Sequence, residues 1–97
     1  MSETSFQVVT TPRFDRLARK LSRRHPGEFV GHLTEAITTL SADPYNTSGT
    51  HPIKKLTAVE EGKFRLRVRR FRFRYDIEGR TVVLLYCALR NEATYRR

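Results

Sequence analysis

The chain has 97 residues, a length typical of one small domain, which we expect to span residues 1–97. It carries 19 Lys and Arg against 10 Asp and Glu, a formal net charge of +9, which attracts phosphate-bearing partners and strengthens their binding at low salt. The single cysteine, Cys87, excludes an intramolecular disulfide, and no stretch approaches the roughly 20 apolar residues of a membrane span. With no basic and then apolar stretch at the N-terminus, we expect a cytoplasmic protein with no membrane partner.

The first half of the chain predicts a strand and two helices. Residues 6–9 (FQVV) favour a short strand, after which Thr10 or Thr11 can cap a helix and Pro12 suits its first turn. The apolar positions of this helix recur at helical spacing: Phe14, Leu17, Ala18 and Leu21. A break at residues 25–27 (HPG) separates it from the second helix.

The second helix has a wider apolar stripe than the first. Its members are Phe29, Val30, Leu33, Ala36, Ile37 and Leu40. We therefore expect this helix to be the more buried of the two. Asp43 and Pro44 end it, and a polar loop follows as far as Pro52.

The second half of the chain predicts strands. They are expected over residues 53–56, 63–69, 71–78 and 81–89, with turns at 60–62 and 78–79. The last strand, TVVLLYCAL, is apolar on both faces and should therefore be central. The predicted fold class is α+β: a strand, a two-helix hairpin and an antiparallel β-meander, with the helices on one face of the sheet.

The most informative stretch is FRLRVRRFRFRY, residues 64–75. Its apolar residues alternate with five arginines: Arg65, Arg67, Arg69, Arg72 and Arg74. Successive side chains of a strand point to opposite faces, so the pattern predicts one apolar face and one cationic face. Five like charges on one face repel each other and favour a polyanion opposite them, which makes nucleic acid the leading partner. The alternative is a face that arginines merely keep soluble.

Residues that commonly bind metal or act as nucleophiles are sparse. His25, His32 and His51 are scattered and form no ligand cluster, so no metal or other cofactor is expected. His25 is predicted in a loop, His32 on a helix surface and His51 near the lysines at 54 and 55. Cys87, inside an apolar run, is predicted to fill the core.

The segments described so far, in their order, resemble the RelE/ParE toxin superfamily of bacterial toxin–antitoxin modules. The resemblance runs from Phe6 to Tyr95 and rests on IKKL, FRLRV, FRFRYDIEG, VVLLY and RNEATY, together with the turn at Leu40, Asp43 and Pro44. It implies two helices packed on a small, curved, mainly antiparallel sheet. It also implies a cognate antitoxin, usually with an acidic segment, that wraps the toxin and silences it.

Two activities follow from this resemblance. RelE-like members enter the ribosomal A site and cut mRNA, whereas ParE-like members inhibit DNA gyrase without nuclease activity. The arginine face favours an endoribonuclease, in which a ribose 2′-OH attacks the neighbouring phosphate without a metal and leaves a 2′,3′-cyclic phosphate. A basic RNA-binding module, or a toxin that has lost its activity, is the third possibility.

The resemblance assigns roles to individual residues. Those implied to be catalytic are Arg65, Arg67, Arg72, Arg90 and Tyr95, and those expected to bind RNA are Lys54, Lys55, Arg69 and Arg74. RelE has lysines where this chain has Arg65 and Arg67. An arginine effectively cannot lose its proton, so the general base must lie elsewhere. Tyr95, Glu92 and His51 are candidates, and the base is left open. The second departure is the pair at 69–70, Arg-Arg, where the family often has Gly-Asp.

Overall fold

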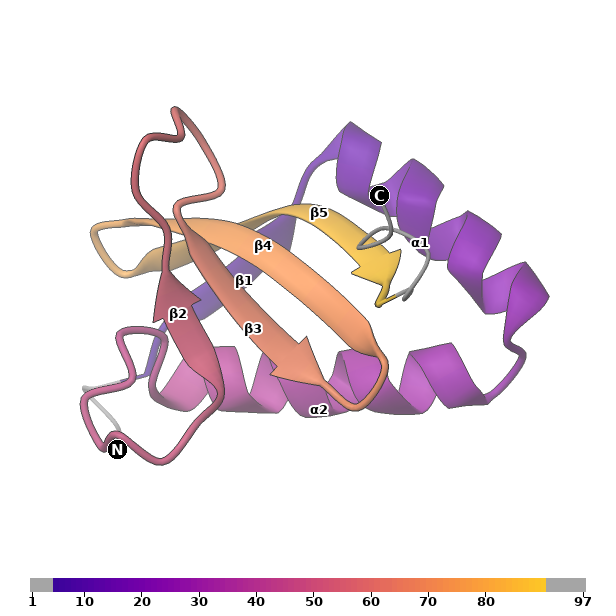
Figure 1. Cartoon of the computed structure of the whole chain (residues 1–97), viewed down its shortest axis with the longest axis horizontal. Coiled ribbons are helices and arrows are strands. Elements are labelled where there is room, and N and C mark those ends of the chain that lie inside the picture. The colour runs from indigo at the N-terminus through magenta and orange to yellow at the C-terminus, as the bar shows by residue number, and fades with distance from the viewer. Residues whose placement is uncertain (1–4, 91–97) are drawn as a thin grey trace.

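The structure is a computed structural model that describes residues 5–90. Its elements are β1 (Gln7–Thr10), α1 (Pro12–Arg24), α2 (Glu28–Ala42), β2 (Ile53–Lys55), β3 (Phe64–Val68), β4 (Phe71–Glu78) and β5 (Thr81–Leu89). The strands form one five-stranded sheet in the order β1-β5-β4-β3-β2. Figure 1 shows α2 running behind β3 and β4, and α1 lying beside β5. The predicted α+β class and the meander are confirmed. No helix within residues 5–90 is long and apolar enough to cross a membrane.

The sheet is mixed because β1 pairs in parallel with β5, while the other three pairings are antiparallel. β5 therefore has neighbours on both sides, as its apolar sequence predicts. The pairing with β1 covers Thr81–Leu84 only, so the second half of β5 has no strand on that side. α1 begins where this pairing ends and lies next to β5.

The start of α1 has the features that its sequence predicts. Thr11 is the N-cap, and its hydroxyl accepts a hydrogen bond from the Phe14 amide at 3.2 Å while donating to the Leu84 carbonyl at 3.1 Å. Pro12 occupies the first turn, where a missing N–H costs nothing. The cap thus fixes both the start of the helix and its attachment to β5.

In α2, the buried stripe is narrower than the sequence predicts. Phe29, Ala36 and Leu40 are buried, whereas Val30 is 50% exposed and Ile37 is 36% exposed. The expectation that all six apolar residues share one buried face was wrong. Positions 29, 36 and 40 follow the helical spacing of seven and four residues, while 30 and 37 lie off that line. α2 still buries more apolar residues than α1, which buries Phe14 alone.

The core lies between the helices and one face of the sheet. Its aromatic centre packs Phe29 against Phe71 and Phe73, with ring centroids 5.3 and 6.1 Å apart. Further along β4, the buried Tyr75 hydroxyl donates to the Pro44 carbonyl at 2.7 Å. This bond ties the loop that follows α2 to the centre of the sheet.

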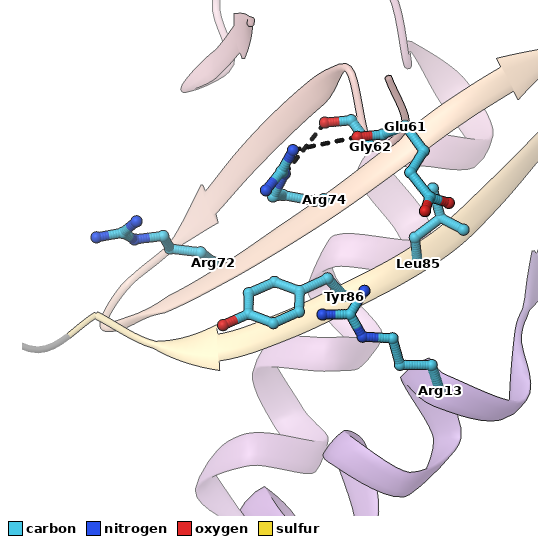
Figure 2. A pocket seen from close by; sticks show the side chains of 7 residues that line it. All are labelled: Arg13, Glu61, Gly62, Arg72, Arg74, Leu85 and Tyr86. Carbon is cyan, nitrogen blue, oxygen red and sulfur yellow. Dashed lines mark hydrogen bonds between the residues drawn. The ribbon is translucent and has the colours of Figure 1, made fainter. Parts of the chain in front are cut away.

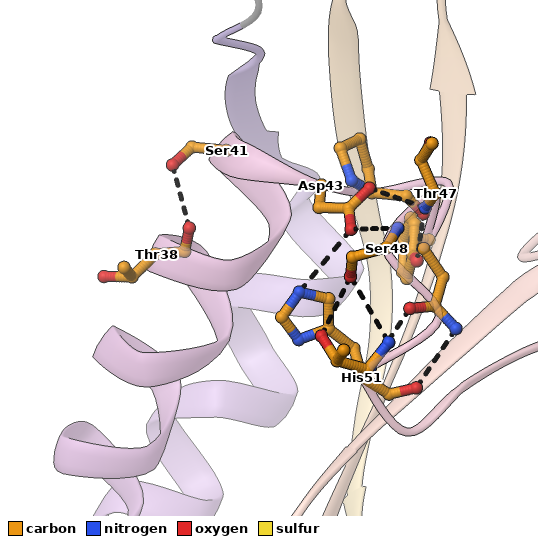
Figure 3. Close-up of polar contacts among 10 residues, drawn as sticks. Thr38, Ser41, Asp43, Thr47, Ser48 and His51 are labelled. Atoms are coloured by element: carbon orange, nitrogen blue, oxygen red, sulfur yellow. Dashed lines mark hydrogen bonds and ion pairs between the residues drawn. The ribbon is translucent and has the colours of Figure 1, made fainter.

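That loop is also held by Asp43, the C-cap of α2 (Figure 3). Its carboxylate accepts from the backbone N–H groups of Ser48 at 3.1 Å and Thr47 at 2.7 Å, and these hydrogen bonds lower the pKa of Asp43. The His51 Nε2 atom lies 3.6 Å from an Asp43 oxygen. His51 therefore contacts Asp43 within this loop and helps to hold the loop in place.

Replacing Tyr75 with phenylalanine should destabilise the protein. The substitution keeps the ring but leaves the Pro44 carbonyl without its partner, and an unsatisfied buried group of this kind costs about 1–3 kcal/mol. Tyr45→Phe is the matched control, because that side chain is 55% exposed. Urea unfolding should show the loss for Tyr75→Phe alone. Equal stability of the two variants would show that the bond to Pro44 contributes nothing.

Candidate active site

Four of the five predicted arginines share the sheet face opposite the core. Directly paired residues of an antiparallel ladder lie on the same face, about 5 Å apart at Cβ. Arg65 pairs with Arg74 and Arg67 pairs with Arg72, while Lys54 extends the first row as the partner of Arg65. The four arginines are half-buried. The β3–β4 hairpin therefore holds two pairs of like charges side by side.

Lys55 and Arg69, both predicted to bind RNA, lie off this face. Lys55 pairs with Phe64, whose ring stacks on the buried Tyr75, and the Lys55 ammonium lies 5.7 Å from the Phe64 ring centre. Lys55 thus faces the helix side of the sheet. Arg69 is not in the strand but in the two-residue turn between β3 and β4, with φ of 56°. Arg69 is exposed at the tip of the hairpin, and the expectation of five arginines on one face was wrong.

Arg74 is held in place by the loop before β3. Its Nε donates to the Gly62 carbonyl and its Nη2 to the Glu61 carbonyl, both at 3.1 Å. On the same loop, the Asp76 carboxylate accepts from the backbone N–H groups of Gly62 at 3.0 Å and Lys63 at 2.7 Å. Two residues of β4 thus clamp the loop: Arg74 binds its carbonyl groups and Asp76 binds its N–H groups. These contacts give the Arg74 guanidinium a defined position.

A β-bulge turns two consecutive residues of β5 toward this face. Arg74 pairs with Tyr86 but Tyr75 pairs with Leu84, so Leu85 is the extra residue. Leu85 and Tyr86 both line the cleft on the arginine face. The Arg13 guanidinium, from the first turn of α1, lies 5.2 Å from the centre of the Tyr86 ring. A cation and an aromatic ring therefore meet at the edge of the arginine face.

Together these side chains form an open cleft of about 420 Å³ (Figure 2). Its lining residues are Arg13, Glu61, Gly62, Arg72, Arg74, Leu85 and Tyr86. Of the predicted site residues, Arg72 and Arg74 line it directly. Figure 2 shows the Glu61 side chain reaching from the loop toward Leu85, which makes it the carboxylate of this lining. The sequence pattern does not identify Arg13, Glu61 and Tyr86 as site residues, because only the folded chain brings them to the hairpin.

The comparisons with known proteins agree with this architecture. No protein-family model and no curated protein matches the chain. Among solved structures, the RelBE2 toxin–antitoxin complex from Mycobacterium tuberculosis contains a chain that is 26% identical, with a TM-score of 0.71, covering 89% of this chain and 99% of that one. A chain of the E. coli DinJ–YafQ complex gives a TM-score of 0.68 at 12% identity, covering 95% and 99%. The protein has a RelE-like toxin fold.

Of the other predicted site residues, the structure places Arg90 and His51. Arg90 follows β5, and its backbone N–H donates to the Arg70 carbonyl, which brings it beside the β3–β4 turn. Tyr95 and Glu92 lie outside the residues that the structure describes. His51, the third candidate base, is not part of the cleft lining and instead faces Asp43.

The remaining histidines and the cysteine pack against or within the core. His32, predicted on the helix surface, is half-buried with its ring 5.6 Å from that of Phe71, and His25 lies 5.7 Å from the same ring. Cys87 is buried as predicted, and burial raises the pKa of its thiol to about 12. Within residues 5–90, no three His, Cys, Asp or Glu side chains are grouped as metal ligands.

Arg70, in the turn between β3 and β4, is bound by a carboxylate of α2. Its Nε and Nη2 donate to the two Glu28 oxygens at 3.1 and 3.0 Å. This hydrogen bonding lowers the pKa of Glu28 and joins the start of α2 to the hairpin tip. Arg70 therefore has a structural role on the helix side of the RelE-like fold.

Gly62→Ala should destabilise the protein more than Gly79→Ala. Both glycines have positive φ, 66° and 62°, so a Cβ adds a similar backbone strain at each. A Cβ at Gly79 meets open space, whereas one at Gly62 lies 3.2 Å from the Arg74 Nε. Displacing Arg74 forfeits its hydrogen bond to the loop, a further loss of about 1 kcal/mol. Urea unfolding of both variants measures this difference, and equal losses would contradict the clamp.

Proposed function

We propose that this chain is the toxin of a type II toxin–antitoxin module and that it acts as a ribosome-dependent endoribonuclease. The observation that carries the proposal is the cleft on the open sheet face, lined by Arg13, Arg72 and Arg74, on a fold shared with the RelBE2 toxin. Cleavage would proceed by attack of a ribose 2′-OH on the neighbouring phosphate of mRNA, with the bond from phosphorus to the 5′ oxygen of the next nucleotide breaking. The products are a 2′,3′-cyclic phosphate and a 5′ oxygen that takes up a proton to become a free 5′-OH. The guanidinium groups would hold the charge that develops on the phosphate.

The cationic side chains of the cleft are held differently, so each is suited to a different role in binding or cleavage. Arg74 is fixed by two backbone carbonyls, so it is suited to hold a phosphate oxygen in one position. Arg72, opposite Arg67 in the next row, is placed to follow the phosphate as negative charge builds up in the transition state. Tyr86, with Arg13 beside its ring, offers a flat surface for a base of the single strand. Arg65, Arg90 and Tyr95 remain predicted participants.

Glu61 is the best-placed proton acceptor among the described residues. Arginines cannot take the 2′-OH proton, and the His51 ring faces Asp43 in another loop. Glu61 lines the same cleft as the arginines and belongs to the loop that Arg74 clamps. A carboxylate on an exposed loop is a weak base without a positioned substrate, which agrees with an enzyme that needs the ribosome to orient mRNA.

The proposed partner that silences the toxin is a cognate antitoxin with an acidic segment. The two solved structures described above are both complexes, and the RelBE2 structure is a toxin–antitoxin complex. The cationic cleft supplies the complementary charge for an acidic segment. Inhibition of DNA gyrase is less favoured, because a protein inhibitor needs neither a clamped arginine nor a carboxylate in the same cleft.

Replacing Arg72 with alanine should abolish most of the cleavage. Loss of one fixed donor that stabilises the negative charge of the transition state slows a reaction by about 10²–10³-fold. Primer extension on mRNA translated with ribosomes measures the cuts, with Arg80→Ala as the control, since Arg80 is exposed and does not line the cleft. Full cleavage by Arg72→Ala would refute the nuclease assignment. DNA breaks with trapped gyrase and intact mRNA would instead support the gyrase inhibitor.

Glu61→Gln should slow the chemical step while RNA binding persists. The amide keeps the size of the side chain but cannot accept the proton, so the single-turnover rate should fall by about 10²–10⁴-fold. Glu60→Gln is the matched control, a neighbouring exposed carboxylate that does not line the cleft. Equal rates for the two variants would show that another group is the base.

A further inference from the structure

A second cationic surface covers the outer side of α1. Six of its 13 residues are cationic, against one acidic residue, Asp15. The cationic residues are Arg13, Arg16, Arg19, Lys20, Arg23 and Arg24. Five of them, with Leu17, line a hollow of about 460 Å³. Within residues 5–90, none of these six side chains has a hydrogen bond or ion pair with a carboxylate.

Helix stability does not account for this arrangement. Cations in the last turn interact favourably with the helix dipole, which suffices to explain Arg23 and Arg24. Arg13 lies in the first turn, at the opposite, positive end, where the dipole disfavours it. Like charges at spacings of three and four, such as Arg16 with Lys20, also repel each other. The face is therefore unfavourable for the isolated protein and is suited to a partner that supplies negative charge.

The chemistry of the face identifies the class of partner. Phe14 of α1 is buried, while Leu17, Ala18 and Leu21 are partly buried against the core. Of these four apolar side chains, Leu17 lines the hollow, where five cationic residues surround it. One partly buried leucine is too little apolar surface to anchor the helix in a membrane or a protein groove. The helix also carries no exposed aromatic ring on which an unpaired base can stack. The exposed face therefore consists mainly of guanidinium groups and one lysine ammonium group, which are hydrogen-bond donors suited to phosphates. This composition is typical of contacts with a nucleic-acid backbone in which the bases are already stacked.

We propose that the outer face of α1 docks onto the phosphate backbone of double-helical RNA. It is separate in chemistry from the cleft, where Tyr86 offers a ring for a single strand, and Arg13 lines both hollows. The choice of RNA over DNA rests on the proposed function. The docking itself does not, because binding of a duplex requires no cleavage.

The test compares two double variants of the full chain that remove the same charge. Arg16→Gln with Lys20→Gln alters the α1 face, and Lys63→Gln with Arg80→Gln removes one arginine and one lysine elsewhere. Glutamine is a good helix former, so α1 should persist, which circular dichroism checks. The probes are a blunt RNA duplex of about 16 base pairs and a polyuridine strand, with binding followed by fluorescence anisotropy over a salt series.

The α1 variant should bind the duplex about tenfold more weakly at low salt, with a slope of log affinity against log salt smaller by about two. The control variant should stay near the wild type, and polyuridine binding should change less than duplex binding. Equal weakening by both variants would overturn the proposal, because bulk charge would then explain the binding. It also fails if the α1 variant keeps its duplex affinity but no longer binds its acidic protein partner, since α1 would then be a protein interface.

Discussion

The register of the β3–β4 hairpin determines both the core and the cleft. Side chains alternate across a strand, so the pairing of Leu66 with Phe73 in the core sets Arg67 beside Arg72 on the other face. A slip of one residue would send the arginines into the core, where unpaired guanidinium groups are very costly. Burial of the aromatic residues therefore forces like charges together against their repulsion. The apolar residues of the hairpin thus determine on which face its arginines lie, and the arginines at the alternate positions make that face cationic.

Two local features position cations of the hairpin, one at a cost in backbone strain and the other through hydrogen bonds. Arg69 has φ of 56°, a conformation that costs a non-glycine residue about 1–2 kcal/mol, and a glycine would be free of that strain. Arg74 donates hydrogen bonds to two carbonyls of a loop, and these bonds fix its guanidinium before any ligand binds. Donors fixed in advance need no reorganisation when charge develops nearby, which is the condition for electrostatic stabilisation of a transition state. The clamp on Arg74 is therefore the step that links the fold to the proposed chemistry.

The sequence predicted those parts of the fold that have a local period. Alternation located β3 and β4, and a threonine followed by proline located the start of α1. The parallel pairing of β1 with β5 has no local signal, because it joins segments over 70 residues apart. The bulge at Leu85 lies in a uniformly apolar run that hides any change of period. Lys54 and Lys55 are different: adjacent strand residues face opposite ways, so their separation was predictable from alternation alone. Glu61 and Arg13 reach the cleft only through tertiary contacts.

The arginine cleft and the outer face of α1 adjoin at Arg13, which lines both hollows. An open cleft whose cations cannot accept a proton depends on orientation supplied from outside, since positioning is worth many orders of magnitude in rate. A helix that grips stacked RNA by its backbone supplies such orientation without reading sequence. Arg13 lies in the first turn of that helix and also next to the ring of Tyr86. An RNA duplex docked on α1 would thus hold an adjoining single strand at the entrance of the arginine cleft. Such docking would explain why the proposed cleavage depends on the ribosome, which contains folded RNA next to the mRNA.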